Sequence, residues 1–180
     1  MKRRALLGLA PVLALPGGAW AQQKPLIVPL KWYVVQVEGD AFTVEMPGIP
    51  DHRVVNDVSA RGTGFALHSY SLETGGYSYV VQTALYPGDV DASQPRRLVQ
   101  AALDDRAKVL ETRKWSKVDW RDSAGGAAAD SIGLLKGGKA LRQLALLKGR
   151  RFVSLAFMGA AASMTGFEAE RFFKSLKMKA

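Results

Sequence analysis

The pattern of apolar and polar residues predicts that the chain is built mainly from β-strands. Phe42, Val44 and Met46 alternate with Thr43 and Glu45, which is the period of a half-buried strand. Six further segments rich in aliphatic or aromatic residues are bounded by turn residues and are also predicted to be strands: 32–38, 65–72, 77–86, 131–136, 140–148 and 151–158. Short glycine-containing turns separate the last three, which therefore predict a meander.

The first helical segment begins shortly after residue 90. Residues 91–93 are expected to cap a helix that accepts Pro95 in its first turn and runs to about Arg113. Asp104 and Lys108 have the spacing of an outward ion pair on this helix. Its predicted apolar stripe consists of Leu98, Val99, Ala102, Leu103, Val109 and Leu110.

A second helix is predicted near the C-terminus. Thr165 and Glu168 have the spacing of a capping box, in which each side chain would accept a hydrogen bond from the backbone at the helix start. The apolar residues that follow recur at the helical period: Ala169, Phe172, Phe173 and Leu176. We expect this face to pack on the sheet.

Together these elements predict an α+β fold, an antiparallel β-sheet with helices packed on it. In segment 77–86 apolar residues occur at both parities, so both faces of the sheet are expected to be covered. Pro47 and Pro50 are expected to end a strand, His52 to lie in a loop, and Gly125 and Gly126 to begin an Ala-rich loop. We find no internal repeat, so residues 32–180 are predicted to be a single domain.

The N-terminus has the features of a secretory signal peptide. Lys2, Arg3 and Arg4 precede an apolar run over residues 5–15, and Ala19-Trp20-Ala21 supplies a cleavage site. We therefore predict a signal peptide over 1–21, an extended lead-in over 22–31 and a periplasmic location. The arginine pair leaves the twin-arginine export route open.

Composition narrows the possible classes of protein. The 180 residues include 25 Lys+Arg, 16 Asp+Glu and no Cys, with a net charge of +9. The missing Cys excludes a disulfide framework, a thiolate metal site and a lipoprotein anchor. Export makes nucleic acid an unexpected partner, and no segment after residue 21 is apolar and long enough to predict a membrane span.

Three short motifs carry a resemblance to a known family. They are Phe42-x-Val44-x-Met46-Pro47-Gly48-x-Pro50, Tyr86-Pro87, and Phe172-Phe173-x-Ser175-Leu176-Lys177. In the order of these motifs, about residues 32–178 of the chain resemble exported bacterial proteins with the PsbP-like or DcrB-like α/β/α sandwich. The resemblance implies a sandwich fold and an accessory or partner-binding role, and it supplies no catalytic residues.

Motifs for catalysis or metal binding are weak. His52 and His68 are the only histidines, and we expect a solvated and a structural imidazole respectively. Gly62-Thr63-Gly64 lacks the third glycine of a dinucleotide fingerprint and is predicted to be a turn. The carboxylate pairs Asp104/Asp105 and Glu168/Glu170 are not predicted to form an acid-base site, because adjacent helical residues point about 100° apart and Glu168 has a capping role. We predict no cofactor.

The aromatic side chains allow two interpretations. Trp32, Tyr77, Tyr79 and Trp115 are expected to pack in the core or across strands, and the alternative is that they line a ligand pocket between the sheet and a helix.

A run of one charge sign is the least ordinary feature of the sequence. Between Asp130 and Glu168 there is no acidic residue, whereas six residues are basic: Lys136, Lys139, Arg142, Lys148, Arg150 and Arg151. Arg142 and Lys148 have equal parity and would share one face of a strand. These cations either solubilise an exposed sheet and protect its edges, or form a surface that binds an anionic partner.

The sequence therefore predicts a non-enzymatic accessory protein of the cell envelope that docks a protein or an anionic envelope component through the six basic residues. A small-molecule carrier with an aromatic pocket is the alternative, and a hydrolase with an unrecognised site is a third hypothesis.

Overall fold

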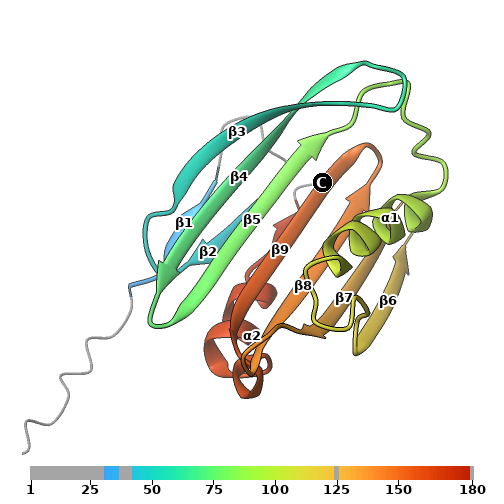
Figure 1. Cartoon of the computed structure of the whole chain (residues 1–180). Helices are drawn as coiled ribbons and strands as arrows, with labels where there is room; N and C mark the ends of the chain where they lie inside the picture. The colour runs from blue at the N-terminus through green and yellow to red at the C-terminus, as the bar shows by residue number, and fades with distance from the viewer. Residues whose placement is uncertain (1–30, 37–41, 124–125, 179–180) are drawn as a thin grey trace, which may run out of the picture.

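The structure is a computed structural model that describes residues 31–36, 42–123 and 126–178 (Figure 1). The predicted signal peptide, residues 22–30 of the predicted lead-in, and Gly125 lie outside the described residues. The elements are β1 (Tyr33–Val35), β2 (Phe42–Met46), β3 (Asp51–Val58), β4 (Gly64–Thr74), β5 (Tyr77–Leu85), α1 (Pro95–Ala107), β6 (Lys117–Ser123), β7 (Gly126–Leu134), β8 (Lys139–Lys148), β9 (Arg151–Ala160), the 3₁₀ helix η1 (Ala161–Ser163), α2 (Phe167–Lys174) and β10 (Lys177–Met178). None of the described helices has the length and apolar character needed to cross a membrane.

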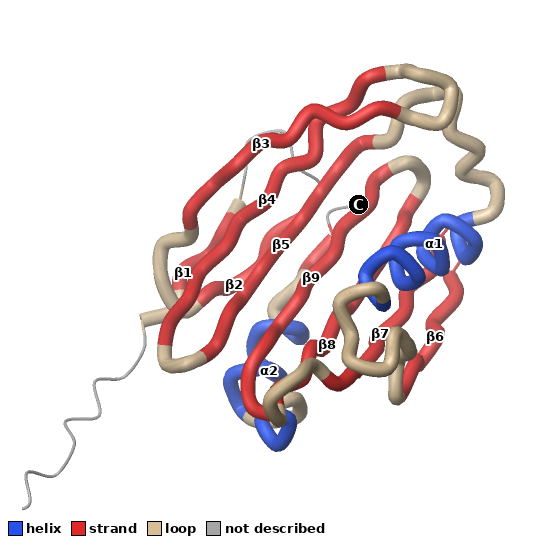
Figure 2. Tube along the Cα trace, in the orientation of Figure 1, coloured by secondary structure: helices blue, strands red, loops and turns tan. Residues whose placement is uncertain are grey.

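The strands form two antiparallel sheets. The large sheet has seven strands in the order β3-β4-β5-β9-β8-β7-β6, and the small sheet has the order β1-β2-β10. β5 pairs with β9, so the large sheet joins two meanders, β3–β5 and β6–β9, that are separated in sequence by α1. These sheets and the two helices, which Figure 2 distinguishes by colour, confirm the predicted α+β class and the antiparallel pairing.

Each face of the large sheet carries its own layer, as the mixed parity of apolar residues predicted. Figure 1 shows α1 in front of β7 and β8, with β1 and β2 behind the sheet. Behind the sheet, Tyr79 and Phe157 pack against Phe42, Val44 and Phe172, and all five side chains are buried. The main core therefore lies between the large sheet and the layer formed by the small sheet and α2.

Small side chains on β7 and β8 allow α1 to lie close to the opposite face. Ala127, Ala129 and Ala145 are buried beneath Val99 and Leu103 of α1, which are completely buried. An alanine side chain ends at Cβ, so the helix backbone approaches the sheet more closely here than it could above longer side chains. α1 is thereby held over β7 and β8, toward one side of the large sheet.

Two segments predicted to be loops are strands. His52 lies in β3, whose eight residues are all exposed, so its sequence has no buried alternation to detect. Gly126 and the alanines after it belong to β7, not to a loop. Ala and Gly have low strand propensity, and here Ala127 and Ala129 are accommodated in a strand that lies under α1.

The capping residues predicted for both helices were wrong. α1 begins at Pro95, as expected, but its N-cap is Gln94 and makes no side-chain capping bond. The helix ends at Ala107 rather than near Arg113, and Lys108 pairs with Asp105 at 2.7 Å instead of with Asp104.

The second helix starts one residue later than a Thr165 cap requires. α2 begins at Phe167 after Gly166, so Thr165 and Glu168 form no capping box. The predicted apolar face is confirmed, because Ala169, Phe172 and Phe173 are buried against the core.

Packing against Tyr77 requires that residue 159 of β9 be a glycine. A Cβ added at Gly159 of β9 would lie 2.5 Å from Cδ1 of Tyr77, whose ring also packs on Phe157 with centroids 5.1 Å apart. The ring of Tyr77 thus occupies the space that any larger residue would need.

We expect Gly159→Ala to destabilise the fold by about 1–3 kcal/mol, because the ring of Tyr77 must move out of its packed position. Gly64→Ala in β4 is the matched control, since its nearest neighbour would be 4.0 Å from the new Cβ. Urea unfolding of both variants measures the difference, and equal stabilities would contradict the packing explanation.

Candidate functional site

A groove between α1 and the large sheet is the strongest candidate for a ligand site. Its volume is about 210 Å³, and residues of α1 and of five strands line it. The register pairs Ala84 with Phe152 and Gln82 with Ser154, which places these lining residues on one face of the sheet. The lining consists of Asp57, Phe65, Leu67, Gln82, Ala84, Tyr86, Ala102, Asp105, Arg106, Gln143, Phe152 and Ser154.

The bottom of this groove contains a buried amide that is only partly hydrogen-bonded. Gln143 is 2% exposed, and its Nε2 donates to Ser154 Oγ at 3.0 Å. The Oε1 atom of Gln143 is buried without a hydrogen-bond partner among the described residues. Turning the amide over would leave Nε2 unpaired instead. A buried amide oxygen without a donor costs about 1–3 kcal/mol, and a ligand that supplied a donor would recover this energy.

Three aromatic rings form a wall of the groove. Phe65 meets Tyr86 edge-on with centroids 5.5 Å apart, and Tyr86 stacks on Phe152 at 5.9 Å. Burial raises the pKa of Tyr86, and the nearby charge of Asp57 raises it further. Tyr86 therefore stays protonated at neutral pH and presents an apolar face together with a neutral hydroxyl.

The charged side chains of the groove mostly have partners. Arg106 donates to Gln82 Oε1 at 2.9 Å, and Asp105 pairs with Lys108 at 2.7 Å. Asp57 accepts a hydrogen bond at 2.8 Å from the neighbouring backbone N–H of Val58. The groove thus offers a ligand one buried hydrogen-bond acceptor beside aromatic faces. The charged side chains around it already form hydrogen bonds within the protein.

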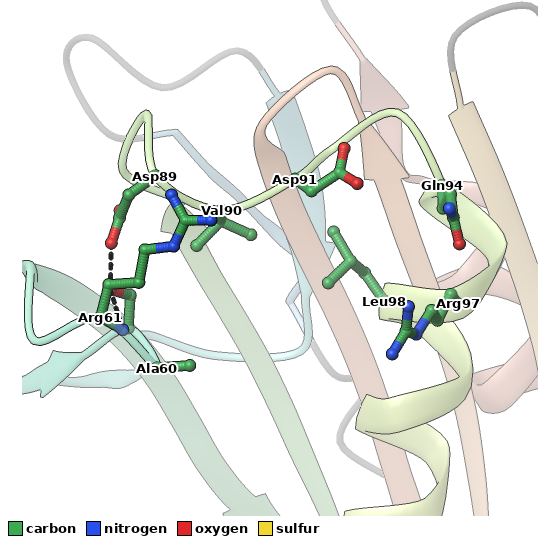
Figure 3. Close-up of a pocket in the computed structure, with 9 residues that line it drawn as sticks. Ala60, Arg61, Asp89, Val90, Asp91, Gln94, Arg97 and Leu98 are labelled. Carbon is green, nitrogen blue, oxygen red and sulfur yellow. Dashed lines mark hydrogen bonds between the residues drawn. The ribbon is translucent and has the colours of Figure 1, made fainter.

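A second hollow, of about 250 Å³, lies between the β3–β4 turn and the loop before α1 (Figure 3). Asp89 Oδ2 accepts hydrogen bonds from Ser59 Oγ at 2.5 Å and Thr63 Oγ1 at 2.9 Å. The bond from Ser59 is the main reason that the pKa of Asp89 is lowered. Figure 3 shows Arg61 beside Asp89, whereas Arg97 projects from α1. These contacts tie two loops together, which is a structural role.

A third hollow, of about 490 Å³, lies beside α2. Its apolar lining includes Leu144, Leu146 and Phe173. The charged groups on its rim include Arg142 and Glu170, which pair with each other at 2.6 Å. Because these charges are already compensated, the hollow offers a weaker case for a polar ligand than the groove under α1.

The structure separates the six basic residues that the sequence grouped. Arg142 is 11% exposed and pairs with Asp130 at 2.8 Å as well as with Glu170. Its guanidinium also donates to the carbonyl of Met164 and lies over the ring of Phe173. Arg142 and Lys148 do share a face of β8, but α2 covers Arg142, so it is not available to a partner.

The remaining five cations lie at opposite ends of β8. Lys136 and Lys139 are at the β7–β8 turn, and Lys148, Arg150 and Arg151 are at the β8–β9 turn. Nine residue steps along a strand separate Lys139 from Lys148, or about 30 Å. The acidic partners of Arg142 are Asp130, which directly precedes the acid-free stretch, and Glu170, which lies two residues beyond Glu168 at its other end. Folding brings both carboxylates to Arg142.

The four aromatic residues considered for a pocket have packing roles. Tyr79 is completely buried, and the ring of Trp32 meets it edge-on at 6.1 Å. Tyr77 covers Gly159, and Trp115 Nε1 donates to the carbonyl of Leu103 at 3.0 Å. A hollow does exist between the sheet and a helix, but different aromatic residues line it.

The two histidines are brought together across β3 and β4. His52 Nε2 and His68 Nδ1 are 3.2 Å apart, and the ring of His52 stacks on Tyr70 with centroids 4.4 Å apart. His68 is thus hydrogen-bonded in a strand, as expected, and His52 is exposed. Among the described residues, no three His, Asp, Glu or Cys side chains are grouped to hold a metal ion.

Sequence reasoning missed the groove although one signal was present. In segment 140–148 the odd positions Leu141, Ala145 and Leu147 are apolar, but Gln143 interrupts them. A polar residue at a buried parity indicates either an internal hydrogen bond or a ligand contact. The other lining residues come from five separate elements, so their convergence depends on the β5–β9 pairing.

Comparisons with known proteins found no relative of this chain. No family model, curated protein or solved structure matches the chain.

We expect Arg142→Leu to destabilise the fold by about 3 kcal/mol, because it leaves the nearly buried carboxylate of Asp130 without its cation. Arg150→Leu, in the same basic stretch but exposed, should change stability by less than about 0.5 kcal/mol. Thermal and urea unfolding measure both variants. Similar losses for the two would show that burial of Arg142 is not the determining factor.

Proposed function

We propose that this protein is a non-enzymatic binding protein that holds a small ring compound in the groove between α1 and the large sheet. The observation that carries the proposal is the buried Oε1 of Gln143, which lacks a donor at the bottom of the groove. The polar groups there are an amide and a hydroxyl that already accepts a hydrogen bond. Such groups orient a ligand, whereas nucleophilic catalysis would require an activating base.

Size and lining suggest the class of ligand. A volume of about 210 Å³ is below the range of about 300–1,000 Å³ that is usual for drug-sized molecules. The rings of Phe65, Tyr86 and Phe152 favour a planar, apolar body. The acceptor on Gln143 favours an N–H or O–H donor. A ligand of one or two rings with a single donor satisfies all three conditions.

Indole and 1-methylindole are a matched pair of probes, because they differ in the N–H donor. We expect indole to bind more tightly than 1-methylindole, and Gln143→Met to weaken indole binding about fivefold while leaving 1-methylindole unchanged. NMR titration of backbone amides gives each Kd and locates the bound probe.

Gln100→Met is the control, since Gln100 is exposed on α1 and bonds to Asp104 outside the groove. It should leave both affinities unchanged. If the two probes bind equally well to all variants, or if the shifted amides lie away from α1 and β8, the groove proposal fails.

A second candidate function is docking of an anionic partner at the β8–β9 turn. Arg150 and Arg151 line a hollow of about 290 Å³ together with His68, and Lys148 is exposed beside them. Lys148 and Arg150 are exposed two residues apart, and together they create a positive field that attracts anionic surfaces and weakens with salt. Of the six predicted basic residues, three lie at this turn, whereas Lys136 and Lys139 lie at the other end of β8.

Vesicles containing phosphatidylglycerol test this second candidate. We expect wild-type protein to sediment with them at low salt and Lys148→Glu/Arg150→Glu to lose most of this binding. Lys136→Glu/Lys139→Glu changes the net charge equally at the other end of β8 and should bind nearly as well as wild type. Equal losses for the two double variants would indicate a nonspecific charge effect.

The predicted export and the family resemblance complete the proposal. The basic and apolar pattern of residues 2–15 and the Ala19-Trp20-Ala21 site support secretion to the periplasm. The resemblance to PsbP-like and DcrB-like proteins supports an accessory role in the cell envelope.

A further inference from the structure

Among the described residues, no strand pairs with the outer edge of β3, and the composition of this edge is unusual. β3 is the terminal strand of the large sheet, and all eight of its residues are exposed. Val54, Val55 and Val58 are 50%, 53% and 63% exposed. Edge strands usually carry charges, bulges or prolines that prevent pairing with another chain. β3 has charges at Asp51, Arg53 and Asp57, but two adjacent exposed valines, Val54 and Val55, lie at its centre.

The other terminal strand, β6, shows the usual protection. Lys117 and Asp119 form an ion pair at 2.6 Å, and Asp122 pairs with Arg96 at 2.9 Å. Pairing through this edge would disturb these charges. The contrast indicates that β3, and not β6, is suited to receive a further strand.

The ladder with β4 determines which backbone groups of β3 point outward. Val58 pairs with Gly64, and the N–H of Ser59 donates to the carbonyl of Thr63 at 2.9 Å. In an antiparallel ladder hydrogen-bonded positions alternate, so Ser59, Asp57, Val55 and Arg53 bond toward β4. The N–H and C=O groups of His52, Val54 and Asn56 therefore face away from the sheet, as does the C=O of Val58, whereas the N–H of Val58 donates to Asp57 Oδ1 at 2.8 Å.

A second copy of β3 can satisfy these outward groups in an antiparallel pair. When Val55 lies on the two-fold axis, Val54 pairs with the partner's Asn56, and Arg53 lies opposite the partner's Asp57 on both sides of the axis. A pair centred on Val54 would oppose Asp51 to the partner's Asp57, which is repulsive. A pair centred on Asn56 would oppose Val55 to Asp57. Charge complementarity thus selects the register centred on Val55.

We propose that two copies of this chain form a dimer by antiparallel pairing of β3, with Val55 on the two-fold axis and two Arg53–Asp57 ion pairs across it. The two large sheets then continue into each other. The interface consists of one strand pair and a few valines, so we expect a weak dimer that dissociates further in high salt.

Charge exchange tests both the partner and the register. Arg53→Asp alone and Asp57→Arg alone each place like charges opposite one another and should be monomeric. A one-to-one mixture of these variants should dimerise, because both acidic side chains of the first variant then face arginines of the second. Sedimentation equilibrium of the full chain up to about 1 mM, a concentration that detects even weak association, gives each Kd.

A backbone variant keeps the test independent of charge. Val54→Pro removes an outward N–H that β4 does not use, so the fold should persist, as circular dichroism and unfolding would show, while dimerisation is lost. The proposal is overturned if wild-type protein remains monomeric at this concentration. It is equally overturned if a dimer persists in the single charge variants, or if their mixture does not associate.

Discussion

The close packing of α1 on β7 and β8 determines where the other functional features of the molecule lie. Three alanines form the surface under Val99 and Leu103, and the helix lies close to the sheet only above them. The same face of β3–β5 stays outside this contact, and the groove forms at the boundary between the covered and uncovered parts. A longer side chain at Ala129 or Ala145 would raise the helix and change the width of the groove.

Arg142 shows that a cation in a stretch without acidic residues can still be paired with carboxylates in the folded protein. In sequence it is the centre of a stretch without acidic residues, yet in the structure two carboxylates and a carbonyl surround its guanidinium. Removing a charge from water is costly unless it is paired and hydrogen-bonded, and Arg142 meets both conditions. The hydrogen bond from Arg142 is also the main reason that the pKa of Glu170 lies below its ordinary value of 4.5. This cluster attaches α2 to β7 and β8.

The sequence predicted the elements whose residues carry a clear period. The alternation of Phe42, Val44 and Met46 and the helical spacing of Ala169, Phe172 and Phe173 both correspond to buried faces. β3 was missed because none of its residues is buried. Residues 131–134 of β7 were predicted to be a strand, but its first half was missed because Ala127 and Ala129 lie under α1 and do not have the branched side chains typical of strands. The candidate site was missed for a different reason: Gln143, Ser154 and Tyr86 meet through strand pairing that no local pattern encodes.

The order of strands also has a consequence for how the chain acquires its structure. Within the large sheet, every pair except β5–β9 joins strands that are consecutive in sequence. The two meanders can therefore form by local contacts, while their junction must close a loop of more than 60 residues, with a correspondingly larger entropic cost. Gln82 and Ala84 belong to one meander, and Gln143 and Ser154 belong to the other. Neither half contains the groove by itself, so the ability to bind a ligand arises only when this slow, long-range step is complete.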